Sequence, residues 1–335
     1  MTSARGTTPL NAHRLALTAA LTVIGLVLLS ACSLFSYTPT ELPSPPATSA
    51  PSPSGPASTP AQCRNPTASY EPTGSLPAPG NLPSGSTMAK IRDRGRLVAG
   101  VSADTYLLAS RNPLTGRIEG FDIDMVKAVA KAIFGDENRY QLRVITAAQR
   151  IPALQEGQVD LVARNMTITC DRWTQIAFSS EYYRAGQKIL VRKGAKATSL
   201  ADLKGQKVCA PRATSSLDNL RKLAPEAVPV EADNHTGCLV LFQQGEVAAI
   251  TGDDTVLAGL AAQDPYAVVP EQRAFTAEPY GLGIPPRNID FVRFVNARLA
   301  QMRSNGEWTA TYNRWLADSL GPAPRPPQAV YGRTP

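Results

Sequence analysis

After Met88, short continuous apolar runs alternate along the chain with segments whose apolar residues recur at helical spacing. Leu97–Val101 is an uninterrupted apolar run, which is typical of a strand buried on both faces. The next segment repeats apolar residues at the spacing of one helix face: Met125, Val126, Val129, Ala130 and Ile133. We expect Asp122 to cap this helix and Gly135 to end it.

The same alternation continues to about residue 163 and starts again after Gly205. The first unit adds strands at 141–146 and 159–163 and a helix at 151–156. The second unit is expected to contain strands at 207–210, 228–230 and 248–251 and helices at 215–223, 236–244 and 254–263. This order predicts an α/β fold in which each unit has a mainly parallel sheet covered by helices.

A separate apolar run at residues 15–29 precedes these units and leads into Leu29-Ser30-Ala31-Cys32. Two arginines stand before it, so the segment has the basic, apolar and small-residue regions of an export signal. The run is about fifteen residues long, short of the roughly 20 that a transmembrane helix needs, which is the alternative interpretation. The four residues from Leu29 to Cys32 resemble the lipobox of bacterial lipoproteins. We therefore predict a signal peptide at 1–31, a lipidated Cys32, and a chain anchored outside the cell.

Composition separates the folded part from its flanks. Residues 32–88 are rich in Pro, Ser and Thr and nearly uncharged, so they cannot bury enough apolar surface to fold, and we predict an extended tether. A second Pro-rich segment, 321–335, is expected to be a loose tail. The net charge of +7 includes no block of Lys and Arg that would grip nucleic acid, and we predict a monomer without a nucleic-acid partner.

Four cysteines remain once Cys32 is set aside, which suits two disulfides in an oxidising compartment. None of them forms the close pair that zinc prefers, so we expect no metal site. Three pairings are possible. We favour Cys209 with Cys238, because both fall in the second unit on a strand and a nearby helix. Cys63 with Cys170 would then fix the end of the tether to the domain.

Six short blocks resemble, in order and spacing, the bacterial extracellular solute-binding proteins of family 3. The similarity covers about residues 89–320 and is closest to the amino-acid-binding lipoproteins of ABC transporters, of the glutamine/glutamate-binding type. No single block is specific, but six in the same order are. The blocks are Arg94 to Val101, Gly120 to Asp124, Met166 to Arg172, Leu200 to Gly205, Gly252 to Asp254 and Glu278 to Gly281.

The resemblance implies the two-lobed fold of periplasmic binding proteins, with two hinge crossovers near 184–190 and 279–283. Lobe 1 would comprise 89–186 and 282–320, and lobe 2 would comprise 187–281. A free amino acid would lie between the lobes and be held by their closure.

Three groups of residues can satisfy the two charges of an amino acid. Arg172 can hold the α-carboxylate with its planar fork, as the matching arginine does in the family. Thr214 and Ser215 stand at a helix start, where hydroxyls and free N–H groups bind anions; simple capping is the other interpretation, and both can hold. By the resemblance these two contact the ligand from lobe 2, and Asp253 presents its carboxylate to the α-ammonium.

Thr167 and the backbone around Asn165 are expected to complete this polar site in lobe 1. Arg150 lies in a segment resembling one that contacts the side-chain carboxylate in glutamate/aspartate-binding relatives, and Arg164 is chosen for its charge alone. Two cations favour glutamate or aspartate as the ligand, with glutamine or asparagine next. Tyr106 is our choice for the aromatic residue that covers the ligand.

The predicted function is capture of an amino acid and its delivery to an ABC permease. A sensor that presents the ligand to a membrane receptor is the alternative. We expect no enzyme and no cofactor, because the chain has no G-x-S-x-G, H-E-x-x-H or phosphate-binding glycine motif. A dehydratase on the same fold is the remaining catalytic alternative. His235 is expected to be a surface or capping residue.

Overall fold

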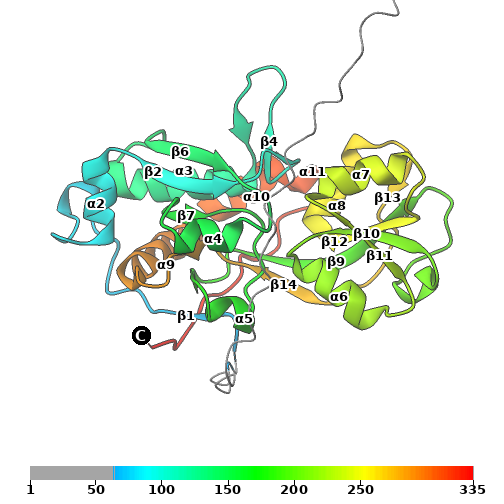
Figure 1. Cartoon of the computed structure of the whole chain (residues 1–335). Coiled ribbons are helices and arrows are strands. Elements are labelled where there is room, and N and C mark those ends of the chain that lie inside the picture. The colour runs from blue at the N-terminus through cyan, green and yellow to red at the C-terminus, as the bar shows by residue number, and fades with distance from the viewer. Residues whose placement is uncertain (1–62, 64, 335) are drawn as a thin grey trace, which may run out of the picture. The chain divides into compact units, whose positions relative to one another are not determined.

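The computed structural model describes Cys63 and residues 65–334. The predicted signal peptide, Cys32 and the predicted tether up to residue 62 lie outside the described residues. The tether prediction is wrong for residues 65–88, because Tyr70, Leu82 and Met88 are buried in the core of lobe 1. Within these residues, two sheets form two lobes that are joined by extended strands (Figure 1). None of the helices in the described part of the chain has the length and apolar character needed to cross a membrane.

Lobe 1 is built on a five-stranded sheet in the order β6-β2-β7-β15-β8. Three of its strands are parallel: β6 (Tyr140–Val144), β2 (Leu97–Val101) and β7 (Leu161–Val162). β15 (Gly283–Ile284) runs antiparallel to β7 and to β8 (Ala177–Phe178). Its helices are α2 (Thr87–Arg94), α3 (Phe121–Phe134), α4 (Arg150–Gln155), α5 (Cys170–Trp173), α9 (Ile289–Ser304), α10 (Glu307–Trp315) and α11 (Ala317–Leu320).

A small antiparallel sheet extends from lobe 1 as a projecting hairpin (Figure 1). It consists of β3 (Asp104–Thr105), β4 (Ala109–Arg111) and β5 (Ile118–Glu119).

Lobe 2 contains the sheet β11-β10-β12-β9-β13. β11 (Val228–Ala232), β10 (Lys207–Pro211) and β12 (Ala249–Asp253) are parallel, and β13 (Ala267–Val268) lies at the edge. The helices are α6 (Ser215–Leu223), α7 (His235–Gln243) and α8 (Asp254–Gln263). Two of these, α6 and α8, have the predicted bounds.

Two strands connect the lobes, at the predicted crossovers. β9 (Tyr183–Arg192) and β14 (Ala277–Tyr280) pair antiparallel and pass between the lobes (Figure 1). β9 then continues into the lobe 2 sheet, antiparallel to β12. The expected parallel core is therefore present in each sheet, and the strands that enter from the crossovers are antiparallel, because no helix returns the chain over the sheet before them.

The core follows the apolar pattern of the sequence. In lobe 1, β2 and α3 contribute to one continuous cluster that includes Phe121, Tyr182 and Trp308. In lobe 2, the consecutive residues Val208 and Cys209 enter two different clusters on opposite faces of the sheet. Such a fully buried parallel strand reads as a continuous apolar run, which is why the sequence revealed it.

The expected cap of α3 is wrong. Gly120 occupies the N-cap position with a φ of 141°, and a Cβ on this residue would lie 2.3 Å from the Leu108 carbonyl oxygen. Asp122 lies one residue inside the helix and is fully buried. Its carboxylate accepts hydrogen bonds from the Tyr182 hydroxyl at 2.7 Å and the Asn165 backbone N–H at 2.8 Å. Asp122 therefore connects three segments of lobe 1.

Both predicted disulfides are present, Cys63–Cys170 and Cys209–Cys238. The first attaches the start of the described chain to α5. The second joins β10 to α7 within lobe 2.

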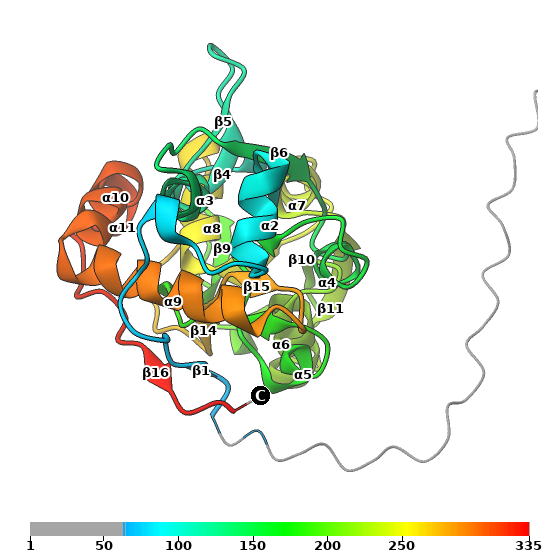
Figure 2. The same ribbon diagram turned by 90° about the vertical axis from the view of Figure 1, so that its left-hand side faces the viewer.

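The C-terminal segment is not loose over its described part. β16 (Val330–Tyr331) pairs in parallel with β1 (Ala68–Ser69), so both ends of the described chain lie on lobe 1 (Figure 2). Arg333 places its guanidinium 3.7 Å from the ring centroid of Trp173 and donates a hydrogen bond to the Ala68 carbonyl. Proline prevents a helix here but permits an extended edge strand.

Candidate functional site

The predicted site residues come together where the two lobes meet. Thr167 of lobe 1 and Ser215 of lobe 2 have their hydroxyl oxygens 3.1 Å apart. Arg150 of lobe 1 donates from Nη2 to the Ala213 carbonyl of lobe 2 at 2.9 Å. The buried polar residues at this junction include Arg150, Arg164, Asn165, Thr167, Arg172, Thr214 and Asp253.

Arg172 is held in place by its own short helix. Thr169 caps α5 by accepting from the Arg172 backbone N–H at 3.1 Å, and the guanidinium donates to the Thr167 carbonyl at 2.7 Å. Burial lowers the pKa of Arg172, and Glu278 and Asp253, in their ionised forms, oppose this shift. A guanidinium has five N–H donors, so Arg172 retains donors for an anion.

The start of α6 supplies the lobe 2 side. Thr214 is the N-cap, as one of the two interpretations required: its hydroxyl accepts from the Leu217 N–H at 3.2 Å and donates to the Pro211 carbonyl at 2.7 Å. Ala213 precedes it with a φ of 55°, and its carbonyl accepts from both Arg150 and Arg172. The Thr214 hydroxyl is thus committed, which leaves the backbone N–H groups of the first turn as the anion donors.

Asp253 ends β12, and a Tyr280 hydroxyl donates to its Oδ2 at 2.6 Å. Its Oδ1 is buried and has no hydrogen-bond partner among the described residues. Burial raises the pKa of Asp253 to about 8, and the neighbouring Glu278 acts in the same direction. An ammonium group placed beside Oδ1 would both satisfy it and favour the ionised form.

Glu278 is a site residue that the sequence reasoning missed. This β14 carboxylate is 2% exposed, and its Oε2 accepts from the hydroxyls of Thr167 at 2.8 Å and Ser215 at 2.7 Å. Its Oε1 accepts from Asn219 and Thr276. Glu278 therefore connects both lobes to a crossover strand. The sequence offered one signal for this role: Glu278 is an acidic residue next to a predicted crossover, in the block Glu278 to Gly281 that resembles the family.

The two arginines proposed for side-chain recognition differ in what they contact. Arg150 donates from Nε to the Ala147 carbonyl at 2.9 Å and from Nη1 to that of Arg164 at 3.3 Å, in addition to its contact with lobe 2. Arg164 donates from Nε to the Ile145 carbonyl at 2.8 Å. The Nη groups of Arg164 make no hydrogen bond with any described residue, so its donors remain free.

Asn165 and Tyr106 have different positions relative to this cluster. Asn165 has a φ of 36°, and its Oδ1 is a second buried acceptor without a partner among the described residues. Tyr106 has an exposed side chain, 45% accessible. Its backbone lies against Gly259 of α8 in lobe 2, where an added Cβ would be 2.7 Å from the Tyr106 carbonyl oxygen.

His235 was expected to be a surface or capping residue; it does not cap α7, and it is only partly exposed. Asn234 caps α7 by accepting from the Gly237 N–H at 2.7 Å. The Nε2 atom of His235 is buried and is a third polar atom at the lobe junction without a partner in the described part of the chain.

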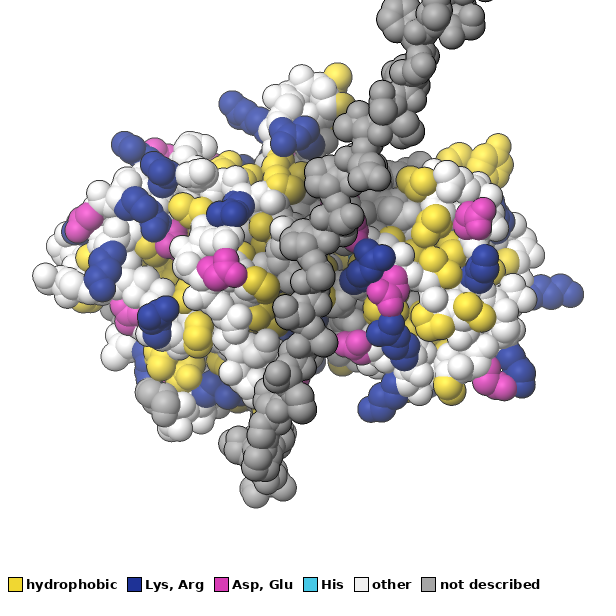
Figure 3. Space-filling model, in the orientation of Figure 1, with side chains coloured by type: hydrophobic (Ala, Val, Ile, Leu, Met, Phe, Trp, Pro, Cys, Tyr) yellow, Lys and Arg dark blue, Asp and Glu magenta, His cyan; other side chains and the backbone are white. Residues whose placement is uncertain are grey.

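The possible metal ligands and the surface charges also bear on the sequence predictions. Among Cys63 and residues 65–334, no group of three or more His, Cys, Asp and Glu residues is placed to hold a metal ion. On the face in Figure 3, Lys and Arg side chains are scattered among acidic ones.

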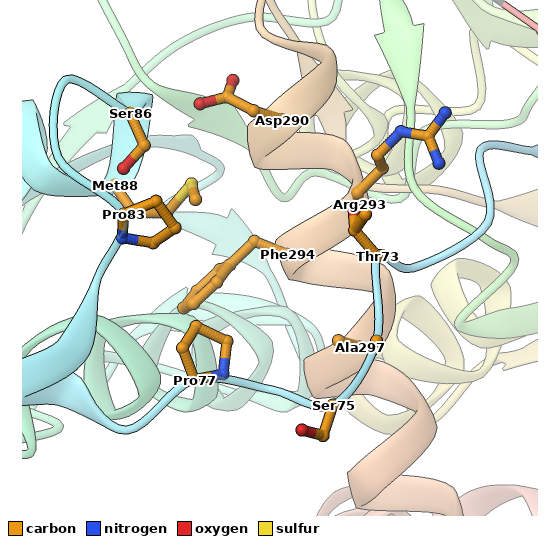
Figure 4. Close-up of a pocket in the computed structure, with 11 residues that line it drawn as sticks. Thr73, Ser75, Pro77, Pro83, Ser86, Met88, Asp290, Arg293, Phe294 and Ala297 are labelled. Atoms are coloured by element: carbon orange, nitrogen blue, oxygen red, sulfur yellow. The ribbon is translucent and has the colours of Figure 1, made fainter.

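A cavity of about 240 Å³ lies apart from the junction, between the N-terminal segment and α9. Figure 4 shows Phe294 between Pro77 and Pro83 in its wall. None of the predicted site residues lines this cavity.

Two lobes are joined by paired crossovers, and an arginine and an aspartate from opposite lobes lie in each other's field. This is the arrangement of a two-lobed binding fold. Residues 97–318 match the family model of the bacterial extracellular solute-binding proteins, family 3. The chain belongs to this family.

Individual relatives and solved structures support the same family assignment. The chain is 38% identical to the ABC transporter glutamine-binding protein GlnH of Bacillus subtilis, over 69% of this chain and 85% of that one. It is 42% identical to the glutamine-binding protein of Geobacillus stearothermophilus, over 59% and 76%. An ancestral arginine-binding protein bound to glutamine superposes with a TM-score of 0.63 at 32% identity, covering 67% of this chain and 98% of that one.

Proposed function

We propose that this protein binds a free amino acid with a carboxamide or carboxylate side chain outside the cell and releases it unchanged to an ABC permease. Lipidated Cys32 would hold it at the membrane. The part of the predicted tether that precedes Cys63 would act as the spacer, because residues 65–88 pack on lobe 1. The proposal includes no catalytic step and no cofactor.

The observation that carries the proposal is that Arg172 of lobe 1 and Asp253 of lobe 2 lie in each other's field at the lobe junction. Arg172 has donors left for a carboxylate, and Asp253 has a buried acceptor left for an ammonium. An amino acid carries these two charges one carbon apart, so it can bridge the two lobes and favour their closure. The names of the relatives described above support glutamine as one candidate ligand.

Isothermal titration calorimetry of the purified protein with the common amino acids tests the ligand class. We expect binding of glutamine, asparagine, glutamate or aspartate, and loss of binding with the corresponding amine that lacks the α-carboxylate. Binding restricted to lysine or arginine, or equal binding of the decarboxylated amine, would refute the proposal.

Cross-linking in membranes tests the partner. We expect the lipidated protein to be captured with a permease of the ABC class, and capture of only a signalling receptor would replace transport by sensing. A Cys32→Ala variant should be released from the membrane fraction. If it remained there, the lipid anchor would be wrong.

A further inference from the structure

The helix that carries Arg172 is too short to hold its own position. α5 has four residues, and a helix of a single turn is not stable in isolation, because its nucleation costs more than its few hydrogen bonds return. Arg172 lies between two residues of α5 that are held from outside the helix, Cys170 and Trp173. The place of the proposed carboxylate donor is therefore set by what holds these two residues.

The N-terminal segment holds both of them. A disulfide joins Cys170 to Cys63, and the indole N–H of Trp173 donates to the Pro66 carbonyl at 2.7 Å. The Tyr70 ring meets the Trp173 ring edge to face, with the centroids 6.1 Å apart. One covalent bond, one hydrogen bond and one aromatic contact thus connect α5 to the start of the described chain.

The C-terminal segment adds a contact from the other chain end. Arg333 follows β16 and places its guanidinium 3.7 Å from the centroid of the Trp173 ring, and a cation over an indole is the most favourable contact of this kind. The same guanidinium donates from Nε to the Ala68 carbonyl at 3.0 Å, and the Arg333 backbone N–H donates to the Ser69 carbonyl at 3.2 Å. Arg333 therefore connects the indole of α5 to β1.

The terminal sheet, formed by β1 and β16, is itself anchored in lobe 1. Asn296 of α9 is fully buried, and its Nδ2 donates to the Ser69 hydroxyl oxygen at 2.9 Å and to the Tyr70 carbonyl at 2.7 Å. The Ser69 hydroxyl donates to the Phe178 carbonyl at 2.8 Å. The Phe178 ring lies against that of Trp173, with the centroids 5.4 Å apart. The contacts thus continue from the core of lobe 1 through the terminal sheet to α5.

The guanidinium of Arg172 points from this fixed backbone to the lobe junction. It donates to the Thr167 carbonyl at 2.7 Å and to the Ala213 carbonyl of lobe 2 at 3.5 Å. Hydrogen bonds weaken steeply with distance, so a displacement of α5 by about 1 Å would remove much of what Arg172 can offer to a carboxylate.

We propose that Arg333 and the Cys63–Cys170 disulfide are positioning groups for amino-acid binding: they hold α5, and through it the Arg172 guanidinium, from the two ends of the chain. This inference rests on the proposed function, in which Arg172 binds the α-carboxylate. It gives the C-terminal segment, which the sequence predicted to be a loose tail, a part in ligand affinity.

Titration calorimetry tests the role of Arg333, with whichever of glutamine, asparagine, glutamate and aspartate binds most tightly. For Arg333→Ala we expect about threefold to tenfold weaker binding, the range of one cation–π contact. Arg333→Lys keeps a cation over the indole and should bind within about twofold of the wild type. Arg325→Ala, a change at an exposed arginine of the same segment, is the control and should bind normally. Unchanged affinity in Arg333→Ala, or no rescue by Arg333→Lys, overturns the proposal.

A double-mutant cycle with Arg172→Lys distinguishes positioning from a merely structural role. If Arg333 acts through Arg172, Arg333→Ala should cost less than about twofold once Arg172 is replaced. The same loss in both backgrounds overturns the proposal. If none of the four amino acids binds the wild type, or if Arg172→Lys retains full affinity, the proposed function fails. If Arg172→Lys weakens binding and the two losses simply add, only the present inference fails.

The two disulfides provide a comparison that does not depend on Arg333. Replacing Cys63 and Cys170 together by Ser should weaken binding by about threefold to tenfold, again with little further loss in the Arg172→Lys background. Replacing Cys209 and Cys238 together by Ala should lower the Tm but leave affinity within about twofold, because that disulfide lies within lobe 2. The titrations are made at a temperature at which circular dichroism shows both variants to be folded. Equal losses of affinity in the two variants would mean that stability, and not the place of α5, sets the affinity, which overturns the proposal.

Discussion

Asp253 shows most directly how burial changes a single residue. With a pKa raised to about 8, it is mostly protonated at pH 7 in the free protein. An ammonium beside Oδ1 would restore the ionised form. We therefore expect ligand binding at pH 7 to release about one proton. Calorimetry in buffers of different ionisation enthalpy measures this release, and its absence in the wild type would contradict the assigned role; Asp253→Asn should abolish it.

The same residue makes a prediction for stability in the absence of ligand. The folded pKa of Asp253 lies above the ordinary value of 3.8, so the folded state holds the extra proton between those two values. Its contribution to stability is complete below about pH 4 and is lost as the pH rises to 8. Thermal unfolding from pH 5 to 8 should therefore show a smaller decline in Tm for Asp253→Asn than for the wild type. Parallel curves would mean that Asp253 is ionised throughout.

Arg172 should not tolerate its closest substitute. Arg172→Lys keeps the charge but loses the planar fork, so we expect amino-acid affinity to fall by about tenfold to a hundredfold. Titration calorimetry checks this. Arg139→Lys, an exposed residue of lobe 1 paired with Asp136, is the control and should bind normally. Equal affinities for both variants would show that a residue other than Arg172 binds the α-carboxylate of the ligand.

At this scale, charged side chains were easier to place from the sequence than their partners. Arg172 and Asp253 lie in recognisable blocks, and both occupy the lobe junction. Glu278 was missed because its role depends on hydroxyls from two other segments. The surroundings of His235 were not predicted because a position at a helix start does not reveal that Gly252 leaves room beneath its ring.

At the scale of elements, the disulfide between β10 and α7 makes a separate prediction. Cys209 and Cys238 are fully buried and 29 residues apart in sequence. Replacing both by Ala should lower the free energy of unfolding by about 3 kcal/mol, since the unfolded chain regains the entropy of the closed loop. Urea unfolding measures the loss, and a change below about 1 kcal/mol would show that packing alone holds α7.

Elements with a strong internal pattern were predicted well. α6 and α8 have the expected bounds. In α6 the Thr214 cap and the apolar spacing agree on where the helix begins. The start of α3 was misjudged because the close approach of Leu108 to Gly120 is a tertiary contact. The pairing of β16 with β1 was missed for the same reason, since its partner lies over 250 residues away in sequence.

For the whole molecule, we predict that closure of the lobes depends on one small residue at their contact. Gly259 of α8 lies against the Tyr106 backbone of lobe 1, and Gly259→Ala would place a Cβ 2.7 Å from that carbonyl oxygen. We expect about tenfold weaker ligand binding, because the closed state becomes less favourable. The free protein should be as stable or slightly more stable, because Ala favours a helix.

Small-angle scattering with and without ligand distinguishes this effect from a local one. The compaction on binding should be reduced in Gly259→Ala and normal in Ala262→Val, an exposed change on the same helix. Full compaction and unchanged affinity in Gly259→Ala would show that the lobes close without this contact.

The Cys63–Cys170 bond has a mechanical consequence. Any pull on the chain from its N-terminal side reaches α5 through this covalent link and stays within lobe 1. Neither β9 nor β14 lies on that load path, so the force is not transmitted through the strands that connect lobe 2. We therefore expect tension on the N-terminal segment to leave the equilibrium between open and closed lobes unchanged.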